Sequence, residues 1–101
     1  KTLFLEDLEP FAEGVNAKIT AFITQNQFDA LVILACNIGM TNFATSSVLK
    51  LVNNPSAQTK DRNLEAAWKS WNRSQGKVMQ GLVNRRNAEW NMYAKNVYAH
   101  W

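Results

Sequence analysis

The segment TQNQFDALVILACNI, from Thr24 to Ile38, decides the fold of this chain. Thr24 followed three residues later by Gln27 matches the capping box, in which two side chains satisfy free N–H groups at the start of a helix. Gly39 is a natural stop at the other end. Apolar residues cover most of the helix surface in between: Phe28, Leu31, Val32, Leu34, Ala35 and Ile38. A helix that is apolar on most sides is buried by its neighbours, so we predict a central helix over residues 25–38.

Further helical segments precede and follow this central helix. Apolar residues recur at helical spacing from Leu8 to Ile19, which predicts a helix over about residues 3–19. Pro10 implies either a kink in that helix or a start near Glu9. After the central helix we expect a loop at 40–45, a short helix capped by Thr45 or Ser46 and running through Val52, and a break at 53–56. A helix at about 61–72, a turn at 72–76 and a last helix at about 78–97 should follow.

The expected fold class follows from these segments. None of them shows sustained alternation of apolar and polar residues, so no strand is predicted. The fold class is therefore all-α, a compact lobe of about five helices with no sheet. Gly81 lies inside the last expected helix, where glycine costs roughly 1 kcal/mol relative to alanine. We therefore expect Gly81 to permit a close contact with a neighbouring element.

The composition is that of one small globular domain or one lobe of a larger one. The 101 residues are 47% hydrophobic and 19% charged, whereas a disordered chain would hold fewer large apolar residues. The longest apolar run, 30–36, is far shorter than the roughly 20 residues that span a bilayer, so we expect no membrane insertion. No charged and then apolar leader is visible at the N-terminus, so the sequence predicts no signal peptide.

Few residues could serve as metal ligands or nucleophiles. A single cysteine, Cys36, excludes an internal disulfide and a multi-cysteine zinc site, and its place on the apolar central helix favours a small hydrophobic role. His100 is the one histidine. These counts leave carboxylates and hydroxyls as the main reactive groups, so the sequence predicts no metal site and no cofactor.

Charge is spread unevenly along the chain. Residues 1–50 carry a net charge of −2 and residues 51–101 a net charge of +5. A basic half can contact nucleic acid, an anionic membrane or an acidic polymer such as cell wall, or it can be an ordinary solvated helix surface. Arg86 falls on the apolar stripe of its own helix, which predicts that it points inward to a carboxylate or a helix C-terminus. We therefore expect no nucleic acid as partner.

Several stretches match, in order and with fitting spacing, the pattern of one enzyme family. They are TQNQFDALV at 24–32, CNIG at 36–39, NF at 42–43, SSVLKLVN at 46–53, Trp71, GKV at 76–78, GLVNRR at 81–86 and Glu89. Together they resemble the phage-type lysozymes, the muramidase family of phage endolysins, with Cys36 in place of the family's Phe. The resemblance runs over residues 3–101 and implies a lysozyme-like helical lobe.

The resemblance also implies which part of such a domain this chain is. Residues 1–20 would be the inter-lobe helix and residues 21–101 the helical bundle, so the chain looks like the C-terminal lobe. In this family the catalytic glutamate lies in an N-terminal lobe, in a Glu-Gly motif followed by a Gly-rich hairpin. Glu13-Gly14 matches the first two letters only, and no Gly-rich hairpin follows. We therefore expect the catalytic lobe to be absent. The start at Lys1, without Met, supports this expectation.

Glycosidic hydrolysis needs a protonated carboxyl on the leaving oxygen and a second group that handles the water or the oxocarbenium charge. No two of the eight Asp and Glu residues can be recognised from the sequence as such a catalytic pair. Glu89 lies four residues after Arg85 and three after Arg86, so its simpler interpretation is an ion pair. The prediction is that this chain holds no catalytic residue and is inactive alone.

Five residues are candidates for substrate binding: Asn37, Ile38, Gly39, Trp71 and Gln75. By resemblance, Asn37 to Gly39 form the floor of the saccharide groove, where free backbone groups and the Asn amide can bond N-acetyl groups; a helix cap is the alternative. Trp71 can stack on a sugar or contact the peptide, or it can be core packing. Gln75, with Lys77, could reach the peptide stem or simply be a solvated turn. Trp68, Trp90 and Trp101 read as packing.

The resemblance predicts part of a peptidoglycan-hydrolysing muramidase that cleaves the bond between N-acetylmuramic acid and N-acetylglucosamine. Its site of action would be the bacterial cell wall, in the periplasm, and its parent a phage endolysin or a secreted antibacterial effector. The expected partners are peptidoglycan and the missing N-terminal lobe, with an inhibitor or immunity protein as an open further partner. The alternative is a stand-alone module that binds cell wall or another protein without catalysis.

Overall fold

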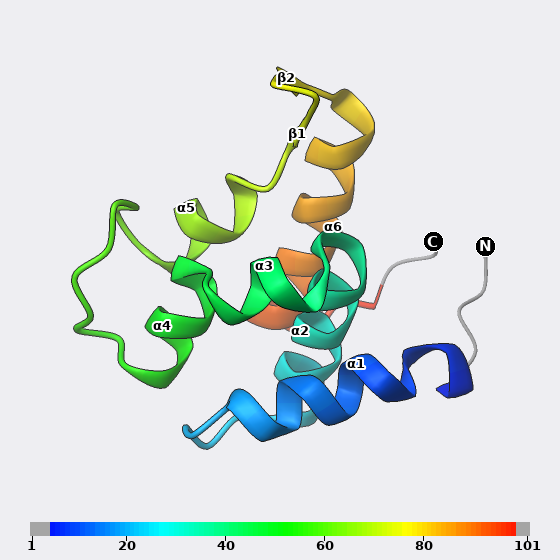
Figure 1. Ribbon diagram of the computed structural model, residues 1–101, viewed down its shortest axis with the longest axis vertical. Coiled ribbons are helices and arrows are strands. Elements are labelled where there is room, and N and C mark those ends of the chain that lie inside the picture. The colour runs from blue at the N-terminus through cyan, green and yellow to red at the C-terminus, as the bar shows by residue number, and fades with distance from the viewer. Residues whose placement is uncertain (1–4, 99–101) are drawn as a thin grey trace.

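A computed structural model of the protein describes residues 5–98 and shows a helical lobe built around one central helix (Figure 1). In chain order the elements are α1 (Leu5–Lys18), α2 (Gln25–Ile38), α3 (Met40–Ala44), α4 (Ser47–Asn53), α5 (Leu64–Lys69), β1 (Arg73–Ser74), β2 (Lys77–Val78) and α6 (Gln80–Lys95). Helix α2 packs most extensively against α6 and α1. The predictions for His100 and Trp101 lie outside the described residues.

Helix α2 is the core of the molecule, as its sequence predicts. The Thr24 side chain accepts a hydrogen bond from the Gln27 N–H, and the Gln27 Oε1 accepts from the Thr24 N–H at 2.9 Å, so the capping box is complete. Every residue from Ala30 to Ala35 is buried. Gly39 ends the helix with φ of 90°, and its N–H donates to the Ala35 carbonyl at 2.8 Å. The predicted span of 25–38 is confirmed.

Helix α1 crosses beside α2 and contains Pro10 within its length. Of the two predicted possibilities, the start near Glu9 is therefore wrong. Val15, fully buried, anchors this helix in the core. Its C-terminal end is held by a distant side chain, because Asn53 Nδ2 donates to the Lys18 carbonyl at 2.9 Å and Asn53 Oδ1 accepts from the Thr20 N–H at 2.8 Å.

Two segments after α2 differ from their predicted forms. The expected loop at 40–45 contains α3, because Phe43 is fully buried and its N–H donates to the Gly39 carbonyl at 2.9 Å. The helix predicted for 61–72 is shorter, since α5 begins after the Asn63 cap, whose side chain bonds the Ala66 N–H at 2.8 Å. Of the two caps predicted for α4, Thr45 and Ser46, the structure has Ser46, whose hydroxyl accepts from the Leu49 N–H.

The expectation of no sheet is wrong, because β1 and β2 form a small antiparallel hairpin. Gln75 and Gly76 connect the strands with φ of 53° and 81°. Two successive positive φ values suit the tightest hairpin turns, whose twist matches that of the flanking strands. Strands of two residues are too short to produce an alternating sequence pattern, which is why the pattern missed them. The hairpin projects at the top of Figure 1 and leads directly into α6.

Helix α6 completes the lobe by packing along α2 and α5. It ends at Asn96, a left-handed cap with φ of 57°. The close contact expected at Gly81 is not there, because a Cβ built at this position would meet no atom within 4 Å. Across the described residues, no helix has the length and apolar character needed to cross a membrane.

Candidate functional site

A groove of about 420 Å³ lies where the end of α2, helix α3, the segment after α5 and the first two turns of α6 meet. Eight residues line it: Asn37, Ile38, Asn42, Ser70, Trp71, Arg73, Leu82 and Arg86. Three of the five predicted binding residues are among them, Asn37, Ile38 and Trp71. Tertiary folding thus brings together the C-terminal end of the central helix and a tryptophan that is 34 residues further along the chain.

Asn37 and Ile38 are already engaged in internal hydrogen bonds. Asn37 Nδ2 donates to the Ile33 carbonyl at 3.1 Å, and Asn37 Oδ1 accepts from Arg85 Nη1. The Ile38 carbonyl accepts from Asn42 Nδ2 at 2.7 Å. The helix end therefore offers fewer free backbone groups than the sequence suggested. One N–H of the Asn37 amide remains for a ligand, and its Oδ1 is shared with Arg85.

Gly39 and Gln75, the other two predicted residues, are not among the residues that line the groove. Gly39 acts as the shared cap of α2 and α3, which is the structural alternative stated for it. Gln75 is exposed at the hairpin turn. Neither contributes to the groove wall in this structure.

Trp71 is half-buried in the connection between α5 and β1, so part of its ring packs against the core while it lines the groove. Its carbonyl accepts from Arg86 Nη1 at 3.3 Å. The packing role predicted for Trp68 and Trp90 is confirmed: their ring centroids lie 5.7 Å apart, and Tyr93 stacks on Trp90 at 5.5 Å. Trp71 thus combines packing against the core with a half-exposed ring in the groove.

Beneath the groove lies a buried polar cluster of Arg86, Glu89 and Trp68. Arg86 Nη2 lies 2.7 Å from Glu89 Oε2, and the Trp68 indole N–H donates to Glu89 Oε1 at 3.0 Å. The inward orientation predicted for Arg86 and the ion pair predicted for Glu89 are both confirmed. Burial raises the pKa of Glu89, and the charge of Arg86 opposes that rise. Glu89 has no exposed surface, so it cannot reach a substrate.

Five lining residues went unrecognised as site residues in the sequence: Asn42, Ser70, Arg73, Leu82 and Arg86. Only Arg73 could have been predicted from its sequence neighbours. It follows Trp71 by two residues, and residues two apart in an extended chain face the same side. That prediction depends on recognising the hairpin. The others reach the groove through packing between distant segments.

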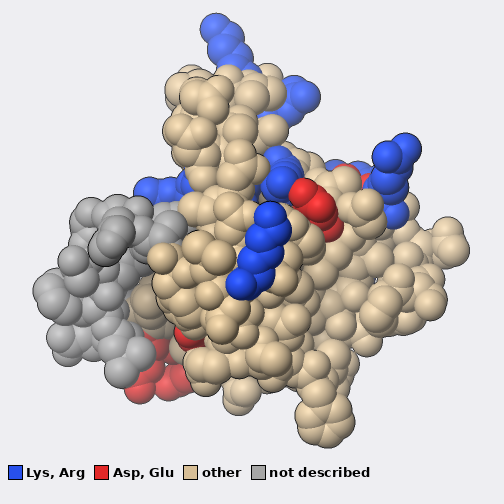
Figure 2. Space-filling model, turned by 180° about the vertical axis from the view of Figure 1, so that it is seen from behind, with Lys and Arg blue, Asp and Glu red and all other residues tan. Residues whose placement is uncertain are grey.

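The groove is basic and has no acidic lining residue. Arg73 lines it directly, and Arg85 is fixed to Asn37 at its edge. On the face shown in Figure 2, most of the blue Lys and Arg surface lies toward the projecting hairpin end. No three His, Cys, Asp or Glu side chains of the described part gather as metal ligands.

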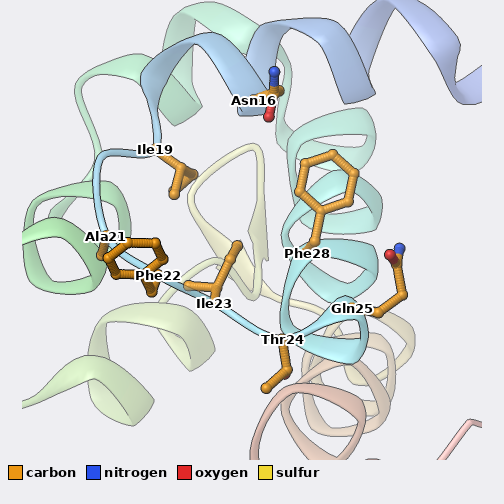
Figure 3. Close-up of a pocket in the computed structure, with 8 residues that line it drawn as sticks. All are labelled: Asn16, Ile19, Ala21, Phe22, Ile23, Thr24, Gln25 and Phe28. Carbon is orange, nitrogen blue, oxygen red and sulfur yellow. The ribbon is translucent and has the colours of Figure 1, made fainter.

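A second hollow, of about 410 Å³, lies between the α1–α2 connection and the start of α2 (Figure 3). It is lined by uncharged residues: Asn16, Ile19, Ala21, Phe22, Ile23, Thr24, Gln25 and Phe28. Phe22 is fully exposed beside it. None of the predicted site residues lines this hollow.

Comparison with known proteins identifies one family. The family profile described as phage lysozyme matches residues 1–89. An endolysin of Bacillus phage PZA is 44% identical over 84 residues, which are 83% of this chain and 31% of that protein. An endolysin of Bacillus phage B103 is 35% identical over 99 residues, covering 94% of this chain and 36% of the relative. The chain thus spans about a third of the length of these two relatives.

Solved structures give the same grouping. The endolysin from Escherichia coli O157:H7 phage FAHEc1 superposes with a TM-score of 0.81 and 36% identity, covering 95% of this chain and 61% of that one. The muramidase domain of SpmX from Asticaccaulis excentricus superposes with a TM-score of 0.75 and 34% identity, covering 89% of this chain and 61% of that one. A helical architecture of the lysozyme type is therefore shared along nearly the whole chain.

Proposed function

Because the chain belongs to the phage lysozyme family, we propose that it supplies one wall of the glycan cleft of a peptidoglycan hydrolase. The reaction is hydrolysis of the bond between N-acetylmuramic acid and N-acetylglucosamine in the bacterial cell wall. The observation that carries this proposal is the groove in which Asn37, Ile38 and Trp71 meet.

The groove has the chemistry that an N-acetyl sugar requires. The half-exposed Trp71 ring offers an apolar face on which a sugar ring can stack, as aromatic side chains do when one face is packed and the other is open. The Asn37 amide can donate to an acetamido carbonyl through its remaining N–H. Because Asn37 is held by two internal hydrogen bonds, its orientation is set before a ligand arrives.

The catalytic carboxyl, in this proposal, comes from a second lobe across the cleft. No Asp or Glu lines the groove, and the carboxylates with identified partners serve the fold: Glu89 pairs with Arg86, Glu65 pairs with Lys69, and Asp29 accepts from Gln25 and Tyr98. A glycosidase needs a carboxyl group beside the scissile bond. The chain alone therefore binds glycan weakly and does not cleave it, and its parent acts at the cell wall in the periplasm as a phage endolysin or a secreted effector.

Binding is tested by titrating chitotetraose into isotope-labelled protein and following amide and indole chemical shifts. We expect shifts at Asn37, Ile38 and the Trp71 indole, with millimolar affinity, about −4 kcal/mol, because one wall contributes few contacts. Trp71→Ala should abolish saturable binding. Phe22→Ala is the matched control, since it removes an exposed aromatic ring from the other hollow (Figure 3). Unchanged spectra throughout the titration would overturn the proposal.

The second candidate is a module that binds cell wall without any catalytic partner, and the absence of acidic lining residues also supports it. The two candidates differ in lysis. The chain by itself should leave a peptidoglycan suspension turbid in both cases. Adding a phage lysozyme catalytic lobe as a separate polypeptide should restore clearing only if the chain is half of a hydrolase. Clearing by the chain alone, lost in Glu13→Gln, would contradict both.

A further inference from the structure

We propose that the hollow at the start of α2 is a self-association surface, where two copies of this chain pair by placing the Phe22 ring of each in the hollow of the other (Figure 3). The inference goes beyond the proposed function and does not rest on it. The hollow lies at the N-terminal end of α2 and the groove at its C-terminal end, and a helix of 14 residues is about 20 Å long. Pairing through the hollow therefore leaves both grooves open.

The first argument is the exposure of Phe22. Its relative exposure is 108%, whereas the other large apolar side chains that are exposed in the described residues reach 46–55%. Its neighbours Ile19 and Ile23 pack against the core, but Phe22 does not. An aromatic ring left in water beside an apolar hollow marks a surface that a protein partner covers.

The second argument is that the segment carrying Phe22 is fixed on both sides. The Thr20 N–H donates to Asn53 Oδ1 at 2.8 Å, and the Thr24 N–H donates to Gln27 Oε1 at 2.9 Å. Phe22 lies midway between these two anchored positions. The ring is thus presented to solvent by an ordered connection, so that a partner has little chain to order on binding.

The third argument is the chemistry of the hollow. Its apolar walls come from three segments, with Ile19 just after α1, Ile23 in the connection and Phe28 on α2 (Figure 3). None of the eight lining residues is charged, although the chain carries a net charge of +3. Two copies can therefore meet at this lining without opposing like charges, whereas a strongly charged partner would find no counter-charge in it.

The fourth argument is self-complementarity. The projecting ring and the hollow of about 410 Å³ belong to one face, since Phe22 itself forms part of the rim. A two-fold rotation brings each ring to the hollow of the other copy, and such an arrangement closes at two copies without further growth. Phe28 in the wall gives the incoming ring an aromatic partner.

The contact area sets the expected strength of the pair. An enclosed aromatic side chain buries about 150–250 Å², so two Phe22 rings and the walls facing them bury about 600–1,000 Å² in total. Standard stable interfaces bury roughly 1,200–2,000 Å². The dimer is therefore weak and dependent on concentration, and it is of use where many copies gather on one polymer, because a dimer carries two grooves.

The test is sedimentation equilibrium of the 101-residue chain from about 10 μM to about 1 mM. We expect the apparent mass to rise from that of one chain toward that of two and to stop there. Concentrated sodium chloride should preserve the association, because the contact is apolar and not electrostatic. In a mixture of isotope-labelled and unlabelled chains, NOEs between chains should join the Phe22 ring to the methyl groups of Ile19 and Ile23.

Phe22→Ala should remain a single chain over the whole concentration range. Val78→Ala is the matched control, because it shortens an exposed apolar side chain on the hairpin, outside the hollow, and should dimerise as the unmodified chain does. A single chain at about 1 mM, a dimer that persists in Phe22→Ala, loss of the dimer in high salt, or growth beyond two copies would each overturn the inference. None of these results bears on glycan binding, which the chitotetraose titration decides separately.

Discussion

The guanidinium of Arg86 and the carboxylate of Glu89 form an ion pair with a separation of 2.7 Å and side-chain exposures of 2% and 0%. Trp68 donates its indole N–H to the same carboxylate, and Arg86 donates to the Trp71 carbonyl. The pair therefore links the core to the groove wall. Two charges removed from water are tolerated because each is compensated by the other and by further hydrogen bonds.

Replacing Glu89 by Gln should destabilise the protein by about 3–5 kcal/mol, because it leaves the Arg86 charge buried without its counter-ion. Glu65→Gln is the control, since Glu65 pairs with Lys69 at 2.6 Å but both side chains are well exposed. Exposed pairs contribute about 0–1 kcal/mol, so this change should be small. Urea denaturation followed by tryptophan fluorescence measures both, and similar losses in the two variants would contradict the importance of burial.

Tyr98 should titrate far above a free tyrosine. Its hydroxyl donates to Asp29 Oδ2 at 2.6 Å, and this hydrogen bond raises the pKa of Tyr98 from 10.0 to about 12. Since the folded state holds this proton more tightly, the stability from the contact is fully present below pH 10 and is lost as the pH rises through about 12. Difference absorbance titration of the protein against Tyr98→Phe isolates this step.

Asp29→Asn supplies the control for Tyr98, because it removes the charge that holds the proton. The pKa of Tyr98 should then return toward 10. If Tyr98 already titrates near 10 in the unmodified protein, the contact between Tyr98 and Asp29 of α2 is not formed in solution.

Gly81→Ala should stabilise the protein by about 0.5–1 kcal/mol. The residue lies within α6, a Cβ there meets nothing within 4 Å, and alanine reduces the freedom of the unfolded chain. Gly39→Ala is the opposite case: space is free, but φ of 90° with ψ of 149° is a conformation that alanine rarely adopts, so it should cost about 1–3 kcal/mol. Thermal unfolding measures the stability of both variants. A loss of stability in Gly81→Ala would contradict the free space found around position 81.

Leu31→Ala should cost about 2–5 kcal/mol, because Leu31 is fully buried in the middle of α2 and its loss leaves a cavity. A phage lysozyme contributed to the measurements behind this range, so the magnitude is taken from the family and is not independent of it. Circular dichroism during denaturation should show a single cooperative transition before and after the change. Truncating the exposed Phe22 to Ala should have little effect, and a loss as large as that of Leu31 would contradict the assignment of the core.

The sequence by itself determined the central helix and the family. Both ends of α2 are decided by neighbours along the chain, the Thr24–Gln27 box and Gly39, so local chemistry was sufficient to place them. Apolar residues on most sides of α2 predicted its burial, and this too is a property of the local sequence. The inward orientation of Arg86 could be predicted because it sits on the apolar side of its own helix.

Tertiary structure decided the elements and contacts that depend on distant residues. The loop expected at 40–45 is helical because Phe43 is buried in a core formed by other segments. The hairpin rests on two-residue strands that carry no periodic signal of their own. The groove joins Asn37 to Trp71 and Arg73 because α6 packs against both α2 and α5. A sequence pattern reports what a residue does within its own element, whereas a site depends on which elements become neighbours.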